Sequence, residues 1–192
     1  MSSIVIAGNT SGAITIAAPA EAGLNTLTLP ASTGTVALTS TAVQTHLTTT
    51  SSQSNTANTR TNISGLNATI TPSTTSKRIK ITIRWNGEHS NGVNYNQLFG
   101  IKRDTTDIGN PAAAGSRPVG MAIIAVNYLN DATSTPDSAT YTYIDSPATT
   151  SATTYHATYL ALNGGTLYNQ RTVLDSGTAE RLTSNIILEE ID

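Results

Sequence analysis

The stretch from Lys77 to Trp85, KRIKITIRW, alternates strictly between two kinds of side chain. Isoleucine or tryptophan occupies every second position from Ile79 onward, and lysine, arginine or threonine fills the positions between them. Successive side chains of a β-strand point to opposite faces of the sheet, so this period of two predicts a strand with one buried face. It is the clearest half-buried strand in the chain, and it requires a sheet.

The sequence after this strand indicates about six more. The expected strands cover residues 95–103, 119–129, 139–144, 154–162, 166–173 and 185–191. Asn86-Gly87 suits a tight turn after the first strand, and Asn163-Gly164-Gly165 suits a hairpin turn. With turn signals between the strands and no convincing helix, residues 76–192 are predicted to form an antiparallel β-sandwich, jelly-roll-like in type.

All aromatic residues of the chain lie in this same region. They are Trp85, Phe99 and seven tyrosines, and each buries about 150–250 Å² when it enters a core. We therefore expect the only sizeable core within residues 76–192. Charged residues make up only 11% of the chain, which is filled instead with Thr, Ser and Asn. Threonine is β-branched and suits strands, so the composition predicts an all-β structural protein.

Residues 41–75 are rich in Thr, Ser and Asn and leave two interpretations open. The first is a flexible polar linker. The second is a short helical stalk, because apolar residues follow one another at spacings of three and four, as an inward-facing helical seam requires. These residues are Val43, Leu47, Ile63, Leu66 and Ile70. Thr and Asn are poor helix formers, so we expect a spacer with one weak oligomerising turn.

Residues 1–40 carry three short runs of β type, separated by Pro, Gly and Asn. The runs are Ile14–Ile16, Leu27–Leu29 and Val36–Leu38. Each is too short to bury itself, and a lone two-stranded hairpin is marginally stable in water. The segment is therefore predicted to anchor the chain by borrowing stability from a partner surface, through strand addition. The anchoring positions are Pro19, Leu27, Leu29, Pro30 and Val36.

The charge and the cysteine count exclude several classes of protein. The net charge is −2 and no extended basic stretch is present, which argues against a nucleic-acid partner. The chain has no cysteine, so disulfides and cysteine-ligated metals are excluded. No apolar run approaches the roughly 18 residues of a membrane-spanning helix, and no secretory signal is expected at the N-terminus.

The sequence predicts no catalytic, metal or cofactor site, and we expect a protein that is not an enzyme. His46, His89 and His156 are scattered, without partners at the spacing of a metal site or a catalytic triad. No GxSxG motif and no EF-hand spacing occurs. The acidic residues near Asp192 are expected to be a solvated chain end.

One face of the first predicted strand is basic. It holds Lys77, Arg78, Lys80 and Arg84. A solvated sheet face is the default interpretation. The alternative is a surface contact, with a neighbouring subunit or with an acidic glycan.

Two parts of the chain resemble phage tail fibres and related virion proteins, especially those of phages that infect cyanobacteria and marine bacteria. The N-terminal resemblance rests on Ala18-Pro19-Ala20, Gly23, Asn25–Pro30 and Thr33–Val36. The C-terminal domain is similar to the terminal β-domain of such proteins over Gly100–Asp104, Ile144–Ser151, Thr154-Tyr155 and Ile186–Ile191.

The resemblance implies a virion structural protein, assembled in the host cytoplasm: a short, homotrimeric tail fibre. Its N-terminus attaches to other virion proteins, in the tail or capsid, and its β-domain is exposed to bind a host cell-surface glycan. The alternative is a capsid decoration protein or head fibre, which stabilises the shell or projects from it. A glycan-degrading depolymerase requires a longer β-helical body and a carboxylate pair, and the sequence shows neither.

Overall fold

A computed structural model describes residues 3–7, 13–17, 41–90, 97–124 and 134–192. The chain divides into two compact units, Met1–Leu38 and Thr39–Asp192. All the regular structure in the described residues is β-strand, so the prediction of an all-β protein is confirmed. Each unit is described by itself below.

The first unit contains a two-stranded antiparallel ribbon made of β1 (Ser3–Ala7) and β2 (Ala13–Ala17). β2 contains the predicted run Ile14–Ile16, whereas β1 was not predicted. The runs at residues 27–29 and 36–38 lie outside the described residues.

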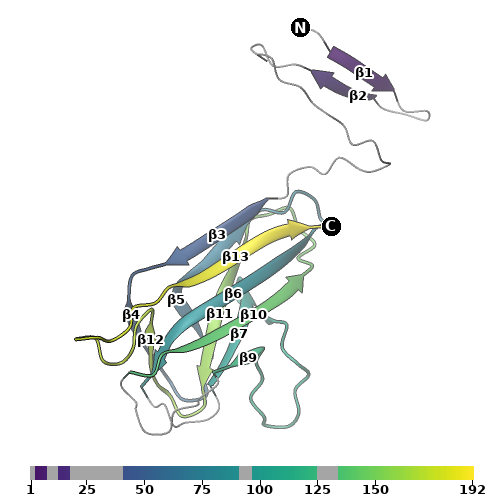
Figure 1. The fold of residues 1–192 in the computed structure, drawn as a ribbon. Helices are drawn as coiled ribbons and strands as arrows, with labels where there is room; N and C mark the ends of the chain where they lie inside the picture. Colours follow the sequence, from purple (N-terminus) through teal and green to yellow (C-terminus); the bar gives the residue numbers. More distant parts are fainter. Residues whose placement is uncertain (1–2, 8–12, 18–40, 91–96, 125–133) are drawn as a thin grey trace. The chain divides into compact units, whose positions relative to one another are not determined.

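The second unit is built of eleven described strands (Figure 1). They are β3 (Ala42–Leu47), β4 (Ser51–Asn55), β5 (Thr61–Ile70), β6 (Arg78–His89), β7 (Gln97–Arg103), β8 (Thr106–Ile108), β9 (Ala122–Ile123), β10 (Asp137–Asp145), β11 (Thr153–Ala161), β12 (Gly165–Asn169) and β13 (Ser184–Ile191). From β6 onward the strands match the predicted ones to within a few residues, with two exceptions. β8 was not predicted, and only β9 appears among the described residues of 119–129.

The pairing of these strands is nested. β3 pairs with β13, β4 with β12, β5 with β11, β6 with β10, and β7 with β8, each pair antiparallel. The chain thus forms one long antiparallel ribbon whose two halves run back along each other. Folding this ribbon over itself places alternate pairs in different layers.

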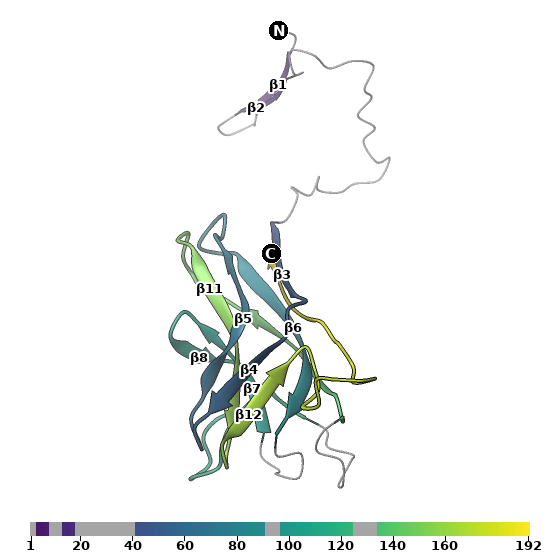
Figure 2. The ribbon, with the colours of Figure 1, turned by 90° about the vertical axis from the view of Figure 1, so that its left-hand side faces the viewer.

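The folded ribbon makes two sheets that face each other (Figure 2). The first sheet has the order β3-β13-β6-β12-β4, and β10 pairs with the other side of β6. The second sheet has the order β5-β11-β7-β8, and β9 also pairs with β7. The order β3-β13-β6-β10 against β5-β11-β7-β8 is the jelly-roll arrangement, so the predicted sandwich and its type are both confirmed.

The expectation that residues 41–75 form a linker or a stalk is wrong. They supply β3, β4 and β5, which are strands of both sheets, so the sandwich begins near Thr39 rather than at residue 76. Ile63, Leu66 and Ile70 are almost completely buried in the core. Their burial against the aromatic residues fixes a segment whose composition alone favours flexibility.

A bulge in β5 explains why its apolar residues have a helix-like spacing. The pairing with β11 jumps from Asn67 opposite His156 to Asn62 opposite Thr158, so β5 contains extra residues at this point. Gly65 lies within the bulge at a φ of 75°, a conformation that glycine adopts without a steric penalty. The bulge turns both Ile63 and Leu66 inward although they are three residues apart.

Asn86-Gly87 does not form the predicted turn, because β6 continues through it to His89. A Cβ atom on Gly87 would lie 2.0 Å from the carbonyl oxygen of Tyr168 and 2.7 Å from the Trp85 ring. The glycine therefore permits the close approach of β12 within the sheet.

The turn at Asn163-Gly164-Gly165 is present, closed by a hydrogen bond from Gly164 N to Ala161 O of 3.2 Å. It is not a hairpin turn, because it leads from β11 in the second sheet to β12 in the first.

The core between the sheets is centred on aromatic rings. Phe99 lies 4.9 Å from Trp85, 5.2 Å from Tyr159 and 6.4 Å from Tyr141, measured between ring centroids. The buried indole of Trp85 donates its Nε1 hydrogen to Asn169 Oδ1 at 2.7 Å. The ring contacts contribute beyond their buried area, and the hydrogen bond satisfies the one polar atom of the indole.

Two of the polar connections between the sheets involve tyrosine hydroxyls. Tyr141 of β10 donates its hydroxyl hydrogen to the Gly100 carbonyl of β7 at 3.0 Å. Tyr155 of β11 donates to Asp145 Oδ2 of β10 at 2.8 Å, and Arg103 Nη1 lies 2.9 Å from the same oxygen. Burial raises the pKa of both tyrosines. These hydroxyls remain donors at all physiological pH values and fix the sheets relative to each other.

Replacing Gly87 with alanine tests whether β12 depends on this close approach. The added methyl group meets a backbone carbonyl, which cannot rotate away as a flexible side chain would. We expect Gly87→Ala to lower the free energy of unfolding by about 3 kcal/mol. Urea unfolding followed by tryptophan fluorescence measures the change. The control is Gln44→Ala, at an exposed position of β3, which is expected to change stability by less than about 0.5 kcal/mol.

Candidate functional site

The five predicted anchoring positions lie outside the described residues. These are Pro19, Leu27, Leu29, Pro30 and Val36, which fall within residues 18–40. The described part of the anchoring segment is the ribbon of β1 and β2, and the other candidate surfaces lie on the sandwich.

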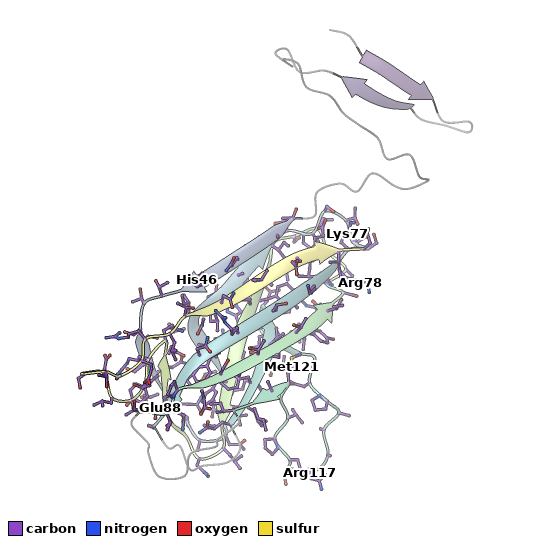
Figure 3. The ribbon with its side chains drawn as sticks, in the orientation of Figure 1. His46, Lys77, Arg78, Glu88, Arg117 and Met121 are labelled. Carbon is purple, nitrogen blue, oxygen red and sulfur yellow. The ribbon has the colours of Figure 1, made fainter. Side chains whose placement is uncertain are left out.

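Of the predicted basic face, Arg78, Lys80 and Arg84 lie on the outer side of β6, where they alternate with the buried isoleucines, and Lys77 directly precedes the strand. Near the end of the chain, Lys77 forms an ion pair with Asp192, and Arg78 Nε donates to the backbone carbonyl of Asp192 at 2.9 Å. Figure 3 shows both cations beside the end of β13. The hydrogen bond raises the pKa of Lys77 and lowers that of Asp192.

The other two basic residues differ in their surroundings. Lys80 Nζ lies 2.7 Å from Glu189 Oε2 on the neighbouring β13. Arg84 is exposed and makes a long contact of 3.5 Å with the Thr183 hydroxyl. Pairing with β13 thus reduces the positive charge that Lys77 and Lys80 present to an acidic ligand. The basic run mainly holds β13 in place.

The sandwich has two different ends (Figure 1). The chain enters at one end, where the Thr41 carbonyl accepts a hydrogen bond from Glu190 N at 2.9 Å. Ser73, in the turn between β5 and β6, also binds the Glu190 carboxylate at this end, at 2.6 Å. At the far end of β6, away from the chain entry, Thr135 and the β12–β13 connection lie beside Glu88 (Figure 3). The chain entry and the loops that contact Glu88 are therefore at different ends of the sandwich.

Glu88 organises the loops near this far end. It lies on the outer side of β6, yet only 1% of its surface is exposed, because two loops cover it. Its Oε1 accepts a hydrogen bond from the Thr135 hydroxyl at 2.9 Å, and its Oε2 accepts one from Val173 N at 2.7 Å. A single carboxylate thus joins the β9–β10 and β12–β13 connections to the sheet.

Asp137 stands beside this buried carboxylate. It begins β10, and its Cα is the register partner of Gly87, the residue before Glu88. Burial, with a further contribution from the Glu88 charge, raises the pKa of Asp137 to about 6. Two carboxylates in one partly desolvated place destabilise each other when both are ionised.

The β12–β13 connection is held by a cluster of charged residues. Asp175 lies between two arginines, 3.4 Å from Arg171 Nη1 and 2.7 Å from Arg181 Nη2. The Arg171 guanidinium also lies over the Tyr168 ring, 4.5 Å from its centroid. Arg181 reaches the Thr50 hydroxyl at 3.0 Å. These contacts give the connection a defined shape and leave the nearby Leu174 side chain exposed.

The three histidines are not brought together. His46 is exposed on the outer side of β3 (Figure 3). His89 is buried at the end of β6, where its Nδ1 lies 2.8 Å from Gln97 Nε2. His156 is half-buried in β11, and burial lowers its pKa. Within the described residues, no group of three or more His, Asp or Glu side chains is placed to hold a metal ion.

The described part of the chain contains no helix that is long and apolar enough to cross a membrane. In the comparisons with known proteins, no family model matches the sequence, and no curated protein matches it.

The Glu88 site was missed by sequence reasoning. Glu88 follows the Asn86-Gly87 pair that was interpreted as a turn, where an acidic residue is ordinary. Its burial results from the loops at residues 134–136 and 172–174, which are more than forty positions away. The only signal in the sequence was that the two-residue alternation of β6 continues through Gly87 as far as Glu88.

Asp137→Asn is expected to stabilise the protein at neutral pH. The folded pKa of about 6 lies above the ordinary value of 3.8, so ionisation of Asp137 costs stability as pH rises from about 4 to 6. Because Asp137 is partly exposed, solvent screening reduces the gain at pH 7 to about 1 kcal/mol. Thermal unfolding at pH 7 and pH 4 measures it. The stabilisation should vanish at pH 4, and an equal effect at both pH values would contradict this electrostatic origin.

Glu88→Ala is expected to loosen the β12–β13 connection. The Val173 amide loses its acceptor, so its protection against hydrogen–deuterium exchange should fall about tenfold, the equivalent of one hydrogen bond of about 1.4 kcal/mol. Glu189→Ala, which removes the partner of Lys80 on the outer face of β13, is the matched control. It should leave the protection at Val173 unchanged.

Proposed function

We propose that the chain is a structural protein of a phage virion: a short, homotrimeric tail fibre. Its N-terminal segment attaches to other virion proteins, and its jelly-roll domain binds a host cell-surface glycan. The resemblance at both ends of the sequence supports this assignment. The observation that carries it is the polarity of the sandwich, whose chain entry at Thr41 and whose loops bound to Glu88 lie at opposite ends.

The proposed mechanism is avidity rather than chemistry. Binding residues are often placed on loops that a rigid scaffold holds, and the Glu88 and Asp175 contacts hold the loops of this end. Several weak contacts from one virion add up to firm attachment, because each bound domain raises the effective concentration of the next. The protein thus requires no catalytic group, cofactor or metal for this role.

A capsid decoration protein or head fibre is the second candidate. One observation favours it: the middle of the outer face of the first sheet carries no charge. There Thr142 of β10, Thr82 of β6, Ile187 of β13 and Gln44 of β3 follow one another across the sheet. Such a row suits packing on a flat protein surface. The same chain would then stabilise the shell instead of recognising a host.

Deletion of residues 1–40 tests the role of the N-terminal segment. Since the described core residues all lie within residues 63–188, the shortened chain should unfold with nearly the same midpoint as the full chain. Phages assembled with the shortened chain should lack it, whereas those with the full chain should carry it. Immunoblots of purified virions measure incorporation. Normal incorporation of the shortened chain would overturn the anchoring assignment.

Antibody labelling of the intact particle separates the two candidates. A tail fibre places the label on the tail, and the exposed domain should then bind host cells saturably, with loss of binding after removal of surface glycans. A decoration protein places the label on the capsid lattice. Electron microscopy of labelled virions shows the position directly.

A further inference from the structure

The connection between β8 and β9 is a long loop that covers residues 109–121. Most connections in compact domains have roughly 4–6 residues, and irregular loops more than twice as long are uncommon and usually functional. Residues 111–117, the tip of this loop, are all exposed. Figure 3 shows Arg117 at the tip, away from the sheets and far from Lys77, which lies near the chain entry.

The two ends of the β8–β9 loop are fixed on the second sheet. Met121 N donates a hydrogen bond to the Phe99 carbonyl of β7 at 2.8 Å. A Cβ atom on Gly120 would lie 2.9 Å from Leu98 Cβ, so the backbone of the loop lies directly on β7 here. Gly109 begins the loop at a φ of 70°, and a Cβ atom on it would lie 3.0 Å from Met121 Cε. The two ends of the loop therefore lie together.

Arg60, in the connection between β4 and β5, ties the loop to the outer face of the same sheet. Only 9% of its side chain is exposed. Its Nη1 donates to the Thr158 hydroxyl at 3.1 Å, its Nη2 donates to the Val119 carbonyl, and its Nε lies 3.6 Å from Asp107 Oδ1. Gly100 leaves room for this guanidinium, because a Cβ atom there would lie 2.6 Å from Nη1. A covered cation with polar partners thus holds the base of the loop.

The tip is restricted by its sequence rather than by contacts. Pro111 and Pro118 stand near its two ends, and proline fixes its own φ and favours an extended conformation in the residue before it. Within the described residues, the only hydrogen bond of residues 111–118 runs from Arg117 N to Ala114 O, at 3.4 Å. A loop that is restricted before binding loses less conformational entropy when a ligand orders it.

Arg117 gives the tip its charge. It is the only charged residue of the β8–β9 loop. Its guanidinium forms no ion pair or hydrogen bond with any described residue, and the nearest acidic residue along the chain, Asp107, already lies beside Arg60. A guanidinium presents a planar fork of N–H donors that matches a carboxylate or a phosphate. The tip therefore suits an anionic group.

We propose that the tip of the β8–β9 loop binds the acid group of a surface glycan, and that Arg117 contacts this group. The Ser116 hydroxyl and the free backbone groups of the tip are available to the sugar hydroxyls. This inference rests on the proposed function and makes it more specific, since it names acidic glycans as the class that the domain recognises. One such contact is weak, so firm attachment requires many copies on one particle.

An array of bacterial polysaccharides that groups neutral, carboxylated and phosphate-bearing polymers tests the proposal with the full chain. The wild-type chain should bind acidic polymers and not neutral ones, the two acidic groups identify the acid, and binding should weaken as the salt concentration rises. Arg117→Gln should raise the concentration for half-maximal binding about tenfold, because one charge-assisted contact is lost. Arg117→Lys keeps the charge without the fork and should give an intermediate value. All variants should unfold at the wild-type midpoint, since the exposed tip supports no part of the sandwich.

Arg84→Gln is the matched control, because it removes an exposed arginine from the outer side of β6 and leaves the loop unchanged. It should bind as the wild-type chain does. Equal binding of neutral and acidic polymers, no binding to any polymer, or unchanged binding by Arg117→Gln would overturn the proposal. Loss of binding in Arg84→Gln alone would also overturn it and would place the contact on the basic face of β6.

The proposed function is judged separately, by the position of the label on the particle and by incorporation into virions. A chain that is found on the tail and binds glycans without Arg117 would overturn this inference and leave the tail fibre assignment in place.

Discussion

The sandwich depends on the register of β6, the strand that three other strands share. β10 pairs along one side of it, and β13 and β12 follow one another along the other side. Its inward side chains from Ile79 to Trp85 are completely buried. A slip of one residue would move this apolar series to the outer face and bring the cations of the strand into the core. Any other register is therefore much higher in free energy. Gly87 then allows β12 to approach, and the nested pairs build outward from this strand.

The part of the fold that the sequence predicted is the part where each strand carries its own signal. Alternation identified β6, and runs rich in Tyr, Ile and Leu identified β7, β10, β11 and β13. β4 has no such signal: its sequence is SSQSN, and it is a strand because β12 offers it an edge to pair with. β5 has a signal that the bulge at Gly65 disguises as a helical period. Both errors arise from contacts that are distant in sequence, which override local preference.

The same distinction holds for the candidate sites. The basic face of β6 was predicted because a strand fixes its own faces. Its partners were not, since Lys80 binds Glu189 across 109 positions of sequence. The carboxylate of Glu88 acquires its role only when two loops fold over it, and the raised pKa of Asp137 follows from its own burial and, to a lesser extent, from the Glu88 charge. Neither local spacing nor residue type encodes which loop covers which side chain.

Because of the nested pairing, the two units also form at different times. The pair β3–β13 joins Val43 to Leu188, so the sandwich closes only when almost the whole chain is available, and such non-local pairing is slow. The ribbon of β1 and β2 joins Ser3 to Ala17, and hairpins of this kind form in roughly 1–10 μs. During synthesis the ribbon emerges before the sandwich, while the remainder of the chain is still unfolded. The ribbon can therefore form before the last strand of the sandwich has been synthesised, and the jelly-roll domain then closes on its own core.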